Sequence, residues 1–181
     1  MGAEAALAVF GRDSGLKSFL LSTLLPELDL RDAVAFARAY PHPWLLREST
    51  ARSPAHSSAA TMLMPTPAAQ APSEGLALAI ALEPARVGAT QVTLGRSHAC
   101  DVEFDEGTLS QLHCVFLKAK DGWSIEDLGS TNGTWVDGAR LLRSQPVPLL
   151  DGARIQAAQL QLTFHDSTGL WRRLEAEAMR P

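Results

Sequence analysis

"EDLGSTNGTWVDG", residues 126–138, places a polar loop beside runs of strand-forming residues. Residues 123–125 precede the loop and Trp135-Val136 follow it, and these runs suit a pleated, half-buried surface. Residues 129–134 between them are glycines or small polar residues, without a bulky apolar group. The pattern predicts a loop with exposed backbone and hydroxyl groups that a sheet supports on both sides.

Similar strand-forming runs recur over residues 76–165, with turn signals between them. Asp121-Gly122 and Asp137-Gly138 are two-residue hairpin signals, and Asp151-Gly152 marks another turn. Many short strands at this spacing predict an all-β sandwich or barrel. The expected strands are 76–82, 91–94, 102–104, 113–118, 123–126, 134–136 and 160–164.

The first 48 residues differ in texture and are expected to form a small helical region. One helix is expected over the apolar run 16–25 and a second over 30–40, where apolar residues recur at helical spacing before Pro41. Two short helices bury only a small core. This region is therefore also a candidate for dimerisation or for docking of another protein.

Two further segments flank the β-rich region. Residues 49–75 are rich in Ser, Ala and Pro, and such a segment buries too little apolar surface to offset the entropy of the chain. We expect a flexible linker there. Residues 166–181 are expected to form a C-terminal helix, with Ser167 or Thr168 as its N-cap.

Composition excludes several classes of protein. A net charge of −4 argues against a general nucleic-acid binder, which would present a basic face. The apolar run 19–25 is too short to span a bilayer. The expectation is a soluble cytoplasmic protein with no nucleic-acid or membrane partner.

The two cysteines, Cys100 and Cys114, show neither a CxxC motif nor metal-ligand spacing. Reduced thiols are expected, and a disulfide stays open as the alternative. A metal site that adds His98 and His113 to the cysteines is disfavoured. The sequence therefore predicts no metal and no cofactor.

Three polar segments interrupt the β pattern, namely 95–97, 109–113 and 129–134. Together they supply a guanidinium, several hydroxyls, side-chain amides and glycines that expose backbone N–H groups. Such a set of donors suits an anion with several acceptor oxygens, and a phosphate group fits that description.

At these segments the chain resembles the forkhead-associated (FHA) domain family. The resemblance covers residues 76–165 and is carried by "LGRSHACDVEFDEGTLSQLHCVF" (94–116) and "WSIEDLGSTNGTWVDG" (123–138). It implies a sandwich of two antiparallel sheets with about eleven strands. It also implies that loops at one end of the sandwich bind phosphothreonine peptides.

The resemblance assigns a role to each matching residue. Arg96 would reach the phosphate, the Ser110 hydroxyl would bond a phosphate oxygen, and Thr131 would help to bind the phosphate. Asn132 would bond the main chain of the ligand. From the residues alone, a surface salt bridge for Arg96 and a simple turn role for Ser110 are the alternatives.

Other matching residues are expected to shape the loops. His113 would brace them by hydrogen bonds, and Gly95, Gly129 and Gly133 would permit tight turns. Gln111 stands where relatives often carry Arg, Lys or Asn. Its amide can still donate to a ligand, but it brings no charge, which puts the strength of phosphate binding in question.

The leading interpretation is a non-enzymatic phosphothreonine-binding adaptor in Ser/Thr kinase signalling of the bacterial kind. Its partners would be phosphothreonine proteins that are substrates of such a kinase or work beside it. One rival is a degenerate FHA-like scaffold that binds partners without phosphate, which Gln111 favours. A second rival is an enzyme acting on a phosphorylated small molecule, for which Asp105 and Asp127 are the nearest carboxylates, without a recognisable catalytic pairing.

Thr61 raises the hypothesis of self-binding. It lies fifteen residues before Leu76. That length of extended chain spans up to about 50 Å, whereas the radius of gyration of a 100-residue domain is about 13 Å. A phosphorylated Thr61 would thus reach the loops of its own chain, as happens in some FHA relatives. Thr50 and Thr66 are lesser candidates, and an unmodified linker threonine is the alternative.

Overall fold

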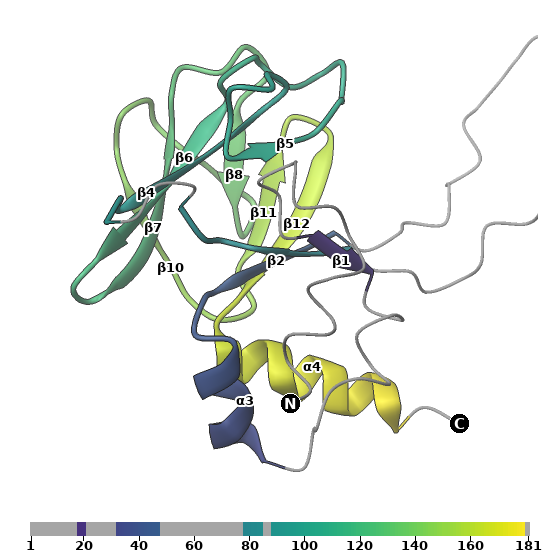
Figure 1. Cartoon of the computed structure of the whole chain (residues 1–181). Coiled ribbons are helices and arrows are strands. Elements are labelled where there is room, and N and C mark those ends of the chain that lie inside the picture. The colour runs from purple at the N-terminus through teal and green to yellow at the C-terminus, as the bar shows by residue number, and fades with distance from the viewer. Residues whose placement is uncertain (1–17, 21–31, 48–77, 85–87, 180–181) are drawn as a thin grey trace, which may run out of the picture.

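The computed structural model describes residues 18–20, 32–47, 78–84 and 88–179. In this part of the chain two β-sheets pack face to face, and two helices lie together at one end of the sandwich (Figure 1). The all-β sandwich expected from the sequence is therefore confirmed. None of the helices in these ranges is long and apolar enough to cross a bilayer.

The larger sheet has seven strands, and every neighbouring pair in it is antiparallel. In spatial order they are β1 (Ser18–Leu20), β3 (Leu78–Ala81), β2 (Trp44–Arg47), β12 (Leu160–His165), β11 (Arg154–Ala157), β8 (Thr134–Val136) and β9 (Ala139–Arg140).

The smaller sheet has five strands and departs in one place from the expected antiparallel pattern. Its spatial order is β10 (Val147–Leu149), β7 (Gly122–Asp127), β6 (Cys114–Ala119), β4 (Gln91–Gly95) and β5 (Val102–Glu103). The β4–β5 pair is parallel, because residues 96–101 carry the chain back along β4 before β5 begins.

The main core lies between the two sheets. Alternate residues of each strand enter it, as the burial of Ile155 and Ala157 in β11 and of Leu160, Leu162 and Phe164 in β12 shows. This period of two is what a strand with one buried face requires. Val92, Leu94, Phe116 and Ile125 face them from the smaller sheet, each less than 1% exposed.

The seven strands expected from the sequence all occur, with ends that differ by at most two residues. Five further strands were not expected, namely β1, β2, β9, β10 and β11. β9 has two residues and β10 carries Pro148, so neither shows a clear strand pattern. β2 is a run of buried residues directly after two prolines, and such a run looks alike in a helix and in a buried strand.

The N-terminal region is not wholly helical. The helix expected over 30–40 is present as α3 (Ala33–Ala39), whose N-cap Asp32 accepts a 2.8 Å hydrogen bond from the Val34 N–H. The helix expected over 16–25 is wrong where the structure describes it, because residues 18–20 form β1. The edge of β3 supplies the backbone partners that make this short run a strand.

The segment before the expected linker belongs to the sandwich. β2 lies between β3 and β12, and Arg47 at its end is paired with Leu78 at the start of β3. The linker 49–75 falls within residues 48–77, which lie outside the described residues. Its two flanks are thus neighbouring strands of one sheet rather than two separate regions.

The C-terminal helix occurs as α4 (Ser167–Ala178), but its N-cap is Asp166, which accepts a 2.7 Å hydrogen bond from the Gly169 N–H. The Ser167 hydroxyl instead donates to the Tyr40 carbonyl at 2.6 Å and so ties α4 to the end of α3. A second core forms where the two helices cover β2 and β3. Its buried residues are Phe36, Trp44, Leu46, Ala79, Ala81, Leu170 and Leu174.

Candidate functional site

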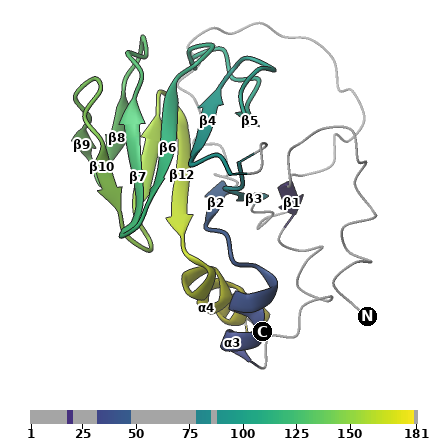
Figure 2. The same ribbon diagram turned by 60° about the vertical axis from the view of Figure 1, so that its left-hand side comes forward.

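Three loops meet at the end of the sandwich that lies away from α3 and α4 (Figure 2). They are 96–101 after β4, 104–113 before β6 and 128–133 after β7. Backbone hydrogen bonds join the first two, from the Arg96 N–H to the Ser110 carbonyl and from the Ser97 N–H to the Gln111 carbonyl, both at 3.0 Å. The polar segments of the sequence are therefore neighbours in space, and we refer to them as the recognition loops.

Gly95 lets two of these loops approach closely. A Cβ at this position would lie 2.2 Å from the Gln111 carbonyl oxygen, which is far inside van der Waals contact. Only a residue without a side chain fits here while the backbone stays in place.

Ser110 and Thr131 meet at the surface of the recognition loops. The Thr131 N–H donates to Ser110 Oγ at 3.0 Å, and the two hydroxyl oxygens are 3.4 Å apart. Ser110 is half-buried and Thr131 is exposed. The structure thus brings together two hydroxyls, 21 residues apart, that can both donate to one anion.

Arg96 and Asn132 lie on either side of this pair along the loops. The exposed Arg96 side chain contacts the Leu109 carbonyl through Nε at 3.4 Å, at the long end of hydrogen-bond distances. Asn132 is also exposed, and its Nδ2 donates to the Thr108 carbonyl at 2.8 Å. Both side chains are anchored by one main-chain contact and keep further donors for a ligand.

Gln111 takes part in the loops through its main chain. Its carbonyl accepts from the Ser97 N–H and from the Cys100 thiol, with Sγ at 3.2 Å. The Gln111 side chain is exposed and makes no hydrogen bond within the part of the chain that the structure describes. It is available to a ligand, but only as a neutral donor.

His113 joins two recognition loops from inside. It is fully buried, its Nδ1 accepts from the Ser110 N–H at 3.1 Å, and its Nε2 donates to the Gly133 carbonyl at 3.0 Å. Burial lowers the pKa of His113 below its usual value, so the ring is neutral with its proton on Nε2. Both ring nitrogens are occupied, and the ring cannot act as a base toward a ligand.

Asp127 holds the 128–133 loop in shape, which the sequence did not predict. Its two carboxylate oxygens accept from the backbone N–H groups of Gly129 and Ser130, and from the hydroxyls of Ser130 and Thr134 at 2.6 Å each. Burial raises the pKa of Asp127, but these hydrogen bonds outweigh it, and the pKa lies below its usual value. The carboxylate is therefore ionised and fully occupied within the protein.

This arrangement removes Asp127 as the carboxylate of a catalytic pair. The signal in the sequence was Asp127 three residues before Ser130, a spacing at which an Asp side chain caps the turn that follows it. Ser130 adds a further link, because its Oγ also accepts from the Gly133 N–H at 3.0 Å. Gly129 and Gly133 adopt φ values of +83° and +85°, which favour glycine.

The cysteines lie beside and beneath the recognition loops. Both are free thiols, Cys100 half-buried and Cys114 buried, and burial raises the pKa of each. Among the described residues, no three His, Cys, Asp or Glu side chains gather so as to hold a metal ion. Thr61 lies outside the described residues.

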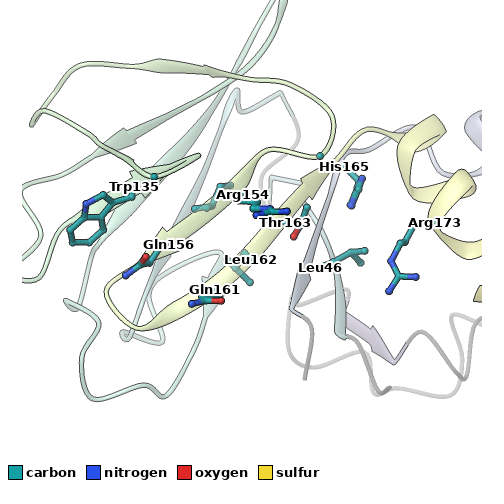
Figure 3. A pocket seen from close by; sticks show the side chains of 12 residues that line it. Leu46, Trp135, Arg154, Gln156, Gln161, Leu162, Thr163, His165 and Arg173 are labelled. Carbon is teal, nitrogen blue, oxygen red and sulfur yellow. The ribbon is translucent and has the colours of Figure 1, made fainter. Parts of the chain in front are cut away.

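A pocket of about 600 Å³ lies away from the recognition loops, on the outer face of the larger sheet (Figure 3). Trp135, Gln156, Gln161 and Thr163 project from β8, β11 and β12, and Arg173 extends from α4. None of the site residues expected from the sequence lines it. The recognition loops therefore remain the candidate site.

Comparison with protein families agrees with the geometry. The family model described as the FHA domain matches residues 92–158. This range includes all three recognition loops and omits β1 to β3, β12, α3 and α4.

Curated relatives also match part of the chain. The transcriptional regulatory protein EmbR of Mycobacterium tuberculosis is 33% identical over 86 residues, covering 48% of this chain and 21% of EmbR. The FHA domain-containing protein FhaB of Mycolicibacterium smegmatis is 32% identical over 80 residues, covering 40% of this chain and 52% of FhaB. The chain thus spans about a fifth of EmbR and about half of FhaB.

Solved FHA-domain structures also match. Mycobacterium tuberculosis EmbR in complex with a low-affinity phosphopeptide matches with 30% identity and a TM-score of 0.41, over 44% of this chain and 21% of that chain. The N-terminal FHA domain of Saccharomyces cerevisiae Rad53p in complex with a phosphothreonine peptide matches with 26% identity and a TM-score of 0.41. That match covers 46% of this chain and 73% of the other.

Proposed function

Since this chain carries an FHA domain at residues 92–158, we propose that it binds phosphothreonine segments of other proteins through its recognition loops. The observation that carries the proposal is the contact of Ser110 and Thr131 on the loops that also carry Arg96. The Thr131 N–H donates to Ser110 Oγ at 3.0 Å, and the two hydroxyl oxygens lie 3.4 Å apart. A phosphate group needs several donors on one side, and this surface offers them.

Each exposed residue of the loops has a proposed part in binding. Arg96 supplies the positive charge and charge-assisted hydrogen bonds to a phosphate that carries close to two negative charges at neutral pH. Ser110 and Thr131 donate their hydroxyl protons to other phosphate oxygens. Asn132 exchanges its bond to the Thr108 carbonyl for the main chain of the peptide, and the Gln111 amide adds a neutral donor.

The buried residues support binding indirectly. His113 and Asp127 use their polar atoms inside the protein, so the loops need no rearrangement when a ligand arrives. A preformed site loses less conformational entropy on binding. The same occupancy leaves neither residue as a general acid or base, which supports a binding module rather than an enzyme.

The proposed role is that of an adaptor in Ser/Thr kinase signalling. Phosphothreonine in a protein is the product of a Ser/Thr kinase, so the partners would be substrates of such a kinase or proteins that work with it. Free thiols at both cysteines support a reducing compartment, and we propose the cytoplasm.

A library of phosphothreonine peptides tests this function. The wild-type chain is expected to retain phosphopeptides and to ignore the same peptides without phosphate. Arg96→Ala is expected to weaken binding by about 1.5–3 kcal/mol, which is the usual contribution of a hydrogen bond to a charged group. Arg172→Ala, an exposed arginine on α4, is the matched control and should bind as the wild type does.

The same experiment separates the adaptor from the degenerate scaffold. If the Arg96→Ala variant is folded by circular dichroism and still captures the partners of the wild type, phosphate is not what the protein recognises. A wild type that binds peptides equally with and without phosphate would lead to the same conclusion.

A second candidate ligand is Thr61 of the chain itself, and the topology of β2 favours it. β2 runs antiparallel to β12 and ends at Arg47, whose guanidinium lies 5.5 Å from the centre of the Phe104 ring. The Phe104 N–H in turn donates to the Gly95 carbonyl at 3.1 Å. The segment that holds Thr61 therefore leaves the sandwich beside the recognition loops.

Chain length is compatible with self-binding. Thr61 follows Arg47 by fourteen residues, which span up to about 50 Å. Thr50 and Thr66 lie in the same segment. A peptide of residues 55–67 phosphorylated at Thr61, titrated against the chain with Thr61→Ala, is expected to bind. Absence of binding there, with other phosphothreonine peptides still bound, would remove Thr61 and leave the adaptor function intact.

A further inference from the structure

A second pocket adjoins the recognition loops and is lined by two arginines. It has a volume of about 390 Å³ and shares Gly129, Ser130 and Gly133 with the 128–133 loop. Thr131 and Asn132 of the same loop do not line it. The pocket therefore lies on the other side of this loop, with walls formed by Arg140, Leu142 and Arg143.

The two loop glycines make room for these arginines. A Cβ on Gly129 would lie 2.6 Å from Cζ of Arg143, so the guanidinium occupies the place of a side chain. A Cβ on Gly133 would lie 3.1 Å from Nε of Arg140 and 2.9 Å from the Trp135 ring. Positive φ explains why these positions favour glycine. The close contacts show that the arginine side chains, together with the Trp135 ring, occupy the space that a side chain on either glycine would need.

Within the part of the chain that the structure describes, the lining of this pocket holds two guanidinium groups against one carboxylate, which leaves an excess of positive charge. Asp127 is the only carboxylate in the lining, and its oxygens already accept four hydrogen bonds from the loop. Neither Arg140 nor Arg143 forms an ion pair with a described residue, and both are exposed. Arg140 is instead held by Trp135, whose ring centre lies 5.5 Å from its Cζ.

We propose that this pocket binds an anionic side chain of the same peptide that places its phosphothreonine on Ser110 and Thr131. The proposal rests on the function proposed above and adds a determinant of sequence specificity. The anionic group is a carboxylate or a second phosphate, both of which an arginine fork can bind through two parallel hydrogen bonds.

The distance between the two sites limits where that group stands in the peptide. Thr131 is two residues from both Gly129 and Gly133. The stretch of loop between the phosphothreonine site and the arginine pocket is therefore at most roughly 7 Å long. An extended peptide advances about 3.3–3.6 Å per residue. The anionic residue is therefore expected about two to four residues from the phosphothreonine, with the arginine side chains covering the remaining distance.

Leu142 makes the pocket more than a patch of charge. Its side chain is 63% exposed beside Arg143, and it offers apolar contact to the aliphatic part of an acidic residue. Exclusion of water by such a contact strengthens the ion pair next to it. Glutamate is thus expected to be preferred over aspartate.

The test is a peptide library with fixed phosphothreonine and four varied positions on each side, which include Asp, Glu and phosphoserine. The wild type is expected to select anionic residues at one position two to four residues from the phosphothreonine. The double variant Arg140→Gln, Arg143→Gln is expected to lose this selection and to bind the selected peptide about 3- to 10-fold more weakly. Its affinity for the same peptide with Ala at that position should stay unchanged.

Two controls keep the result specific. Arg172→Gln removes one positive charge from α4 and should keep the selection. Arg143→Glu alone should turn the preference toward Lys at the same position, which also covers the case that the double variant does not fold.

The outcomes separate the two proposals. A wild type that binds phosphothreonine peptides without preference for an anionic neighbour, or variants that retain that preference, would overturn the arginine pocket alone. A wild type that binds no phosphothreonine peptide would overturn the proposed function and this inference with it. Selection of phosphoserine but not Glu would assign the pocket to a second phosphate.

Discussion

The Thr131 N–H donates a hydrogen bond of 3.0 Å to Ser110 Oγ, across 21 residues of chain. This bond orients both hydroxyls at the surface of the recognition loops without a charged partner. Ser110 is in turn held by its own N–H, which donates to the buried His113 ring. Ser110 is thus held by its backbone N–H and by the bond that its Oγ accepts, while its own hydroxyl proton makes only the 3.4 Å contact with Thr131 Oγ1.

Ser110→Ala tests this relationship. The substitution removes a hydroxyl proposed to bond phosphate and the acceptor of the Thr131 N–H, so phosphopeptide affinity is expected to fall about tenfold, equivalent to about 1.4 kcal/mol. The free energy of unfolding should fall by only about 0.5–1.5 kcal/mol. Calorimetric titration and urea unfolding measure the two effects. Thr168→Ala, an exposed site on α4, should change neither.

Gly95→Ala is expected to destabilise the protein and to disturb binding. The added Cβ would lie 2.2 Å from the Gln111 carbonyl oxygen, and this contact is with backbone that cannot turn aside. The free energy of unfolding is expected to fall by about 1–3 kcal/mol, which is the usual cost of overpacking. Gly107→Ala is the control, because nothing lies within 4 Å of its Cβ position. Equal stability of the two variants would contradict the close approach.

Asp127→Asn is expected to cost about 2–4 kcal/mol of stability, because the amide offers a donor where the Ser130 and Thr134 hydroxyls need an acceptor. The pKa of Asp127 lies below its usual value in the folded protein. Its contribution is therefore present above the pKa of about 3.9 that an unfolded chain shows, and is lost as pH falls through the lower folded value.

Urea unfolding between pH 7 and pH 3 measures this effect. The difference in stability between the wild type and Asp127→Asn should shrink on acidification. Asp121→Asn, an exposed carboxylate in the turn between β6 and β7, is the control and should leave the stability at pH 7 unchanged. A constant difference across the range would show that the Asp127 charge does not support the loop.

The pKa values of His113 and His98 are expected to be shifted in opposite directions from the usual value. Burial lowers the pKa of His113, whereas the 2.6 Å contact of His98 Nδ1 with Glu103 raises the pKa of His98. An unfolded histidine gains its proton near pH 6.5, in round terms. As pH falls from that value toward the folded pKa of His113, the unfolded state binds the proton more readily and stability falls.

A pH titration of the two rings followed by NMR checks this difference between their pKa values. The His98 signals should shift above pH 6.5 and the His113 signals below it, with loss of stability over the lower range. His113→Gln should be less stable at pH 7 and should lack that part of the pH dependence. Titration of His113 together with His98 would contradict the buried neutral ring.

Much of the architecture was predictable from local pattern. The runs of strand-forming residues and the Asp-Gly turns predicted seven strands of the sandwich, and the FHA resemblance selected Arg96, Ser110 and Thr131. Among the strands that were missed, β1 and β9 are short, β10 contains a proline and β2 is buried over three consecutive residues. In such segments the choice of strand is made by a neighbouring strand rather than by the segment itself.

β2 illustrates the limit of local pattern. Trp44, Leu45 and Leu46 are buried because β3 and β12 pair with β2 from both sides and the two helices cover it. No spacing within residues 41–48 contains that information, so the segment was assigned to a helical region. β2 ends at Arg47 beside Phe104, and for this reason we propose Thr61, fourteen residues further along the chain, as a ligand of the recognition loops.

By itself the sequence determined the sandwich and its polar loops, since strand period and turn chemistry are properties of short segments. The resemblance of residues 94–116 and 123–138 to the FHA family indicated which loop residues would meet phosphate. Only the tertiary structure decided what surrounds them. The Asp127 side chain is bound within the 128–133 loop, Arg143 lies against Gly129, and Arg140 lies against Gly133. These contacts depend on which distant segments pack together, and that choice is made by burial of the whole core.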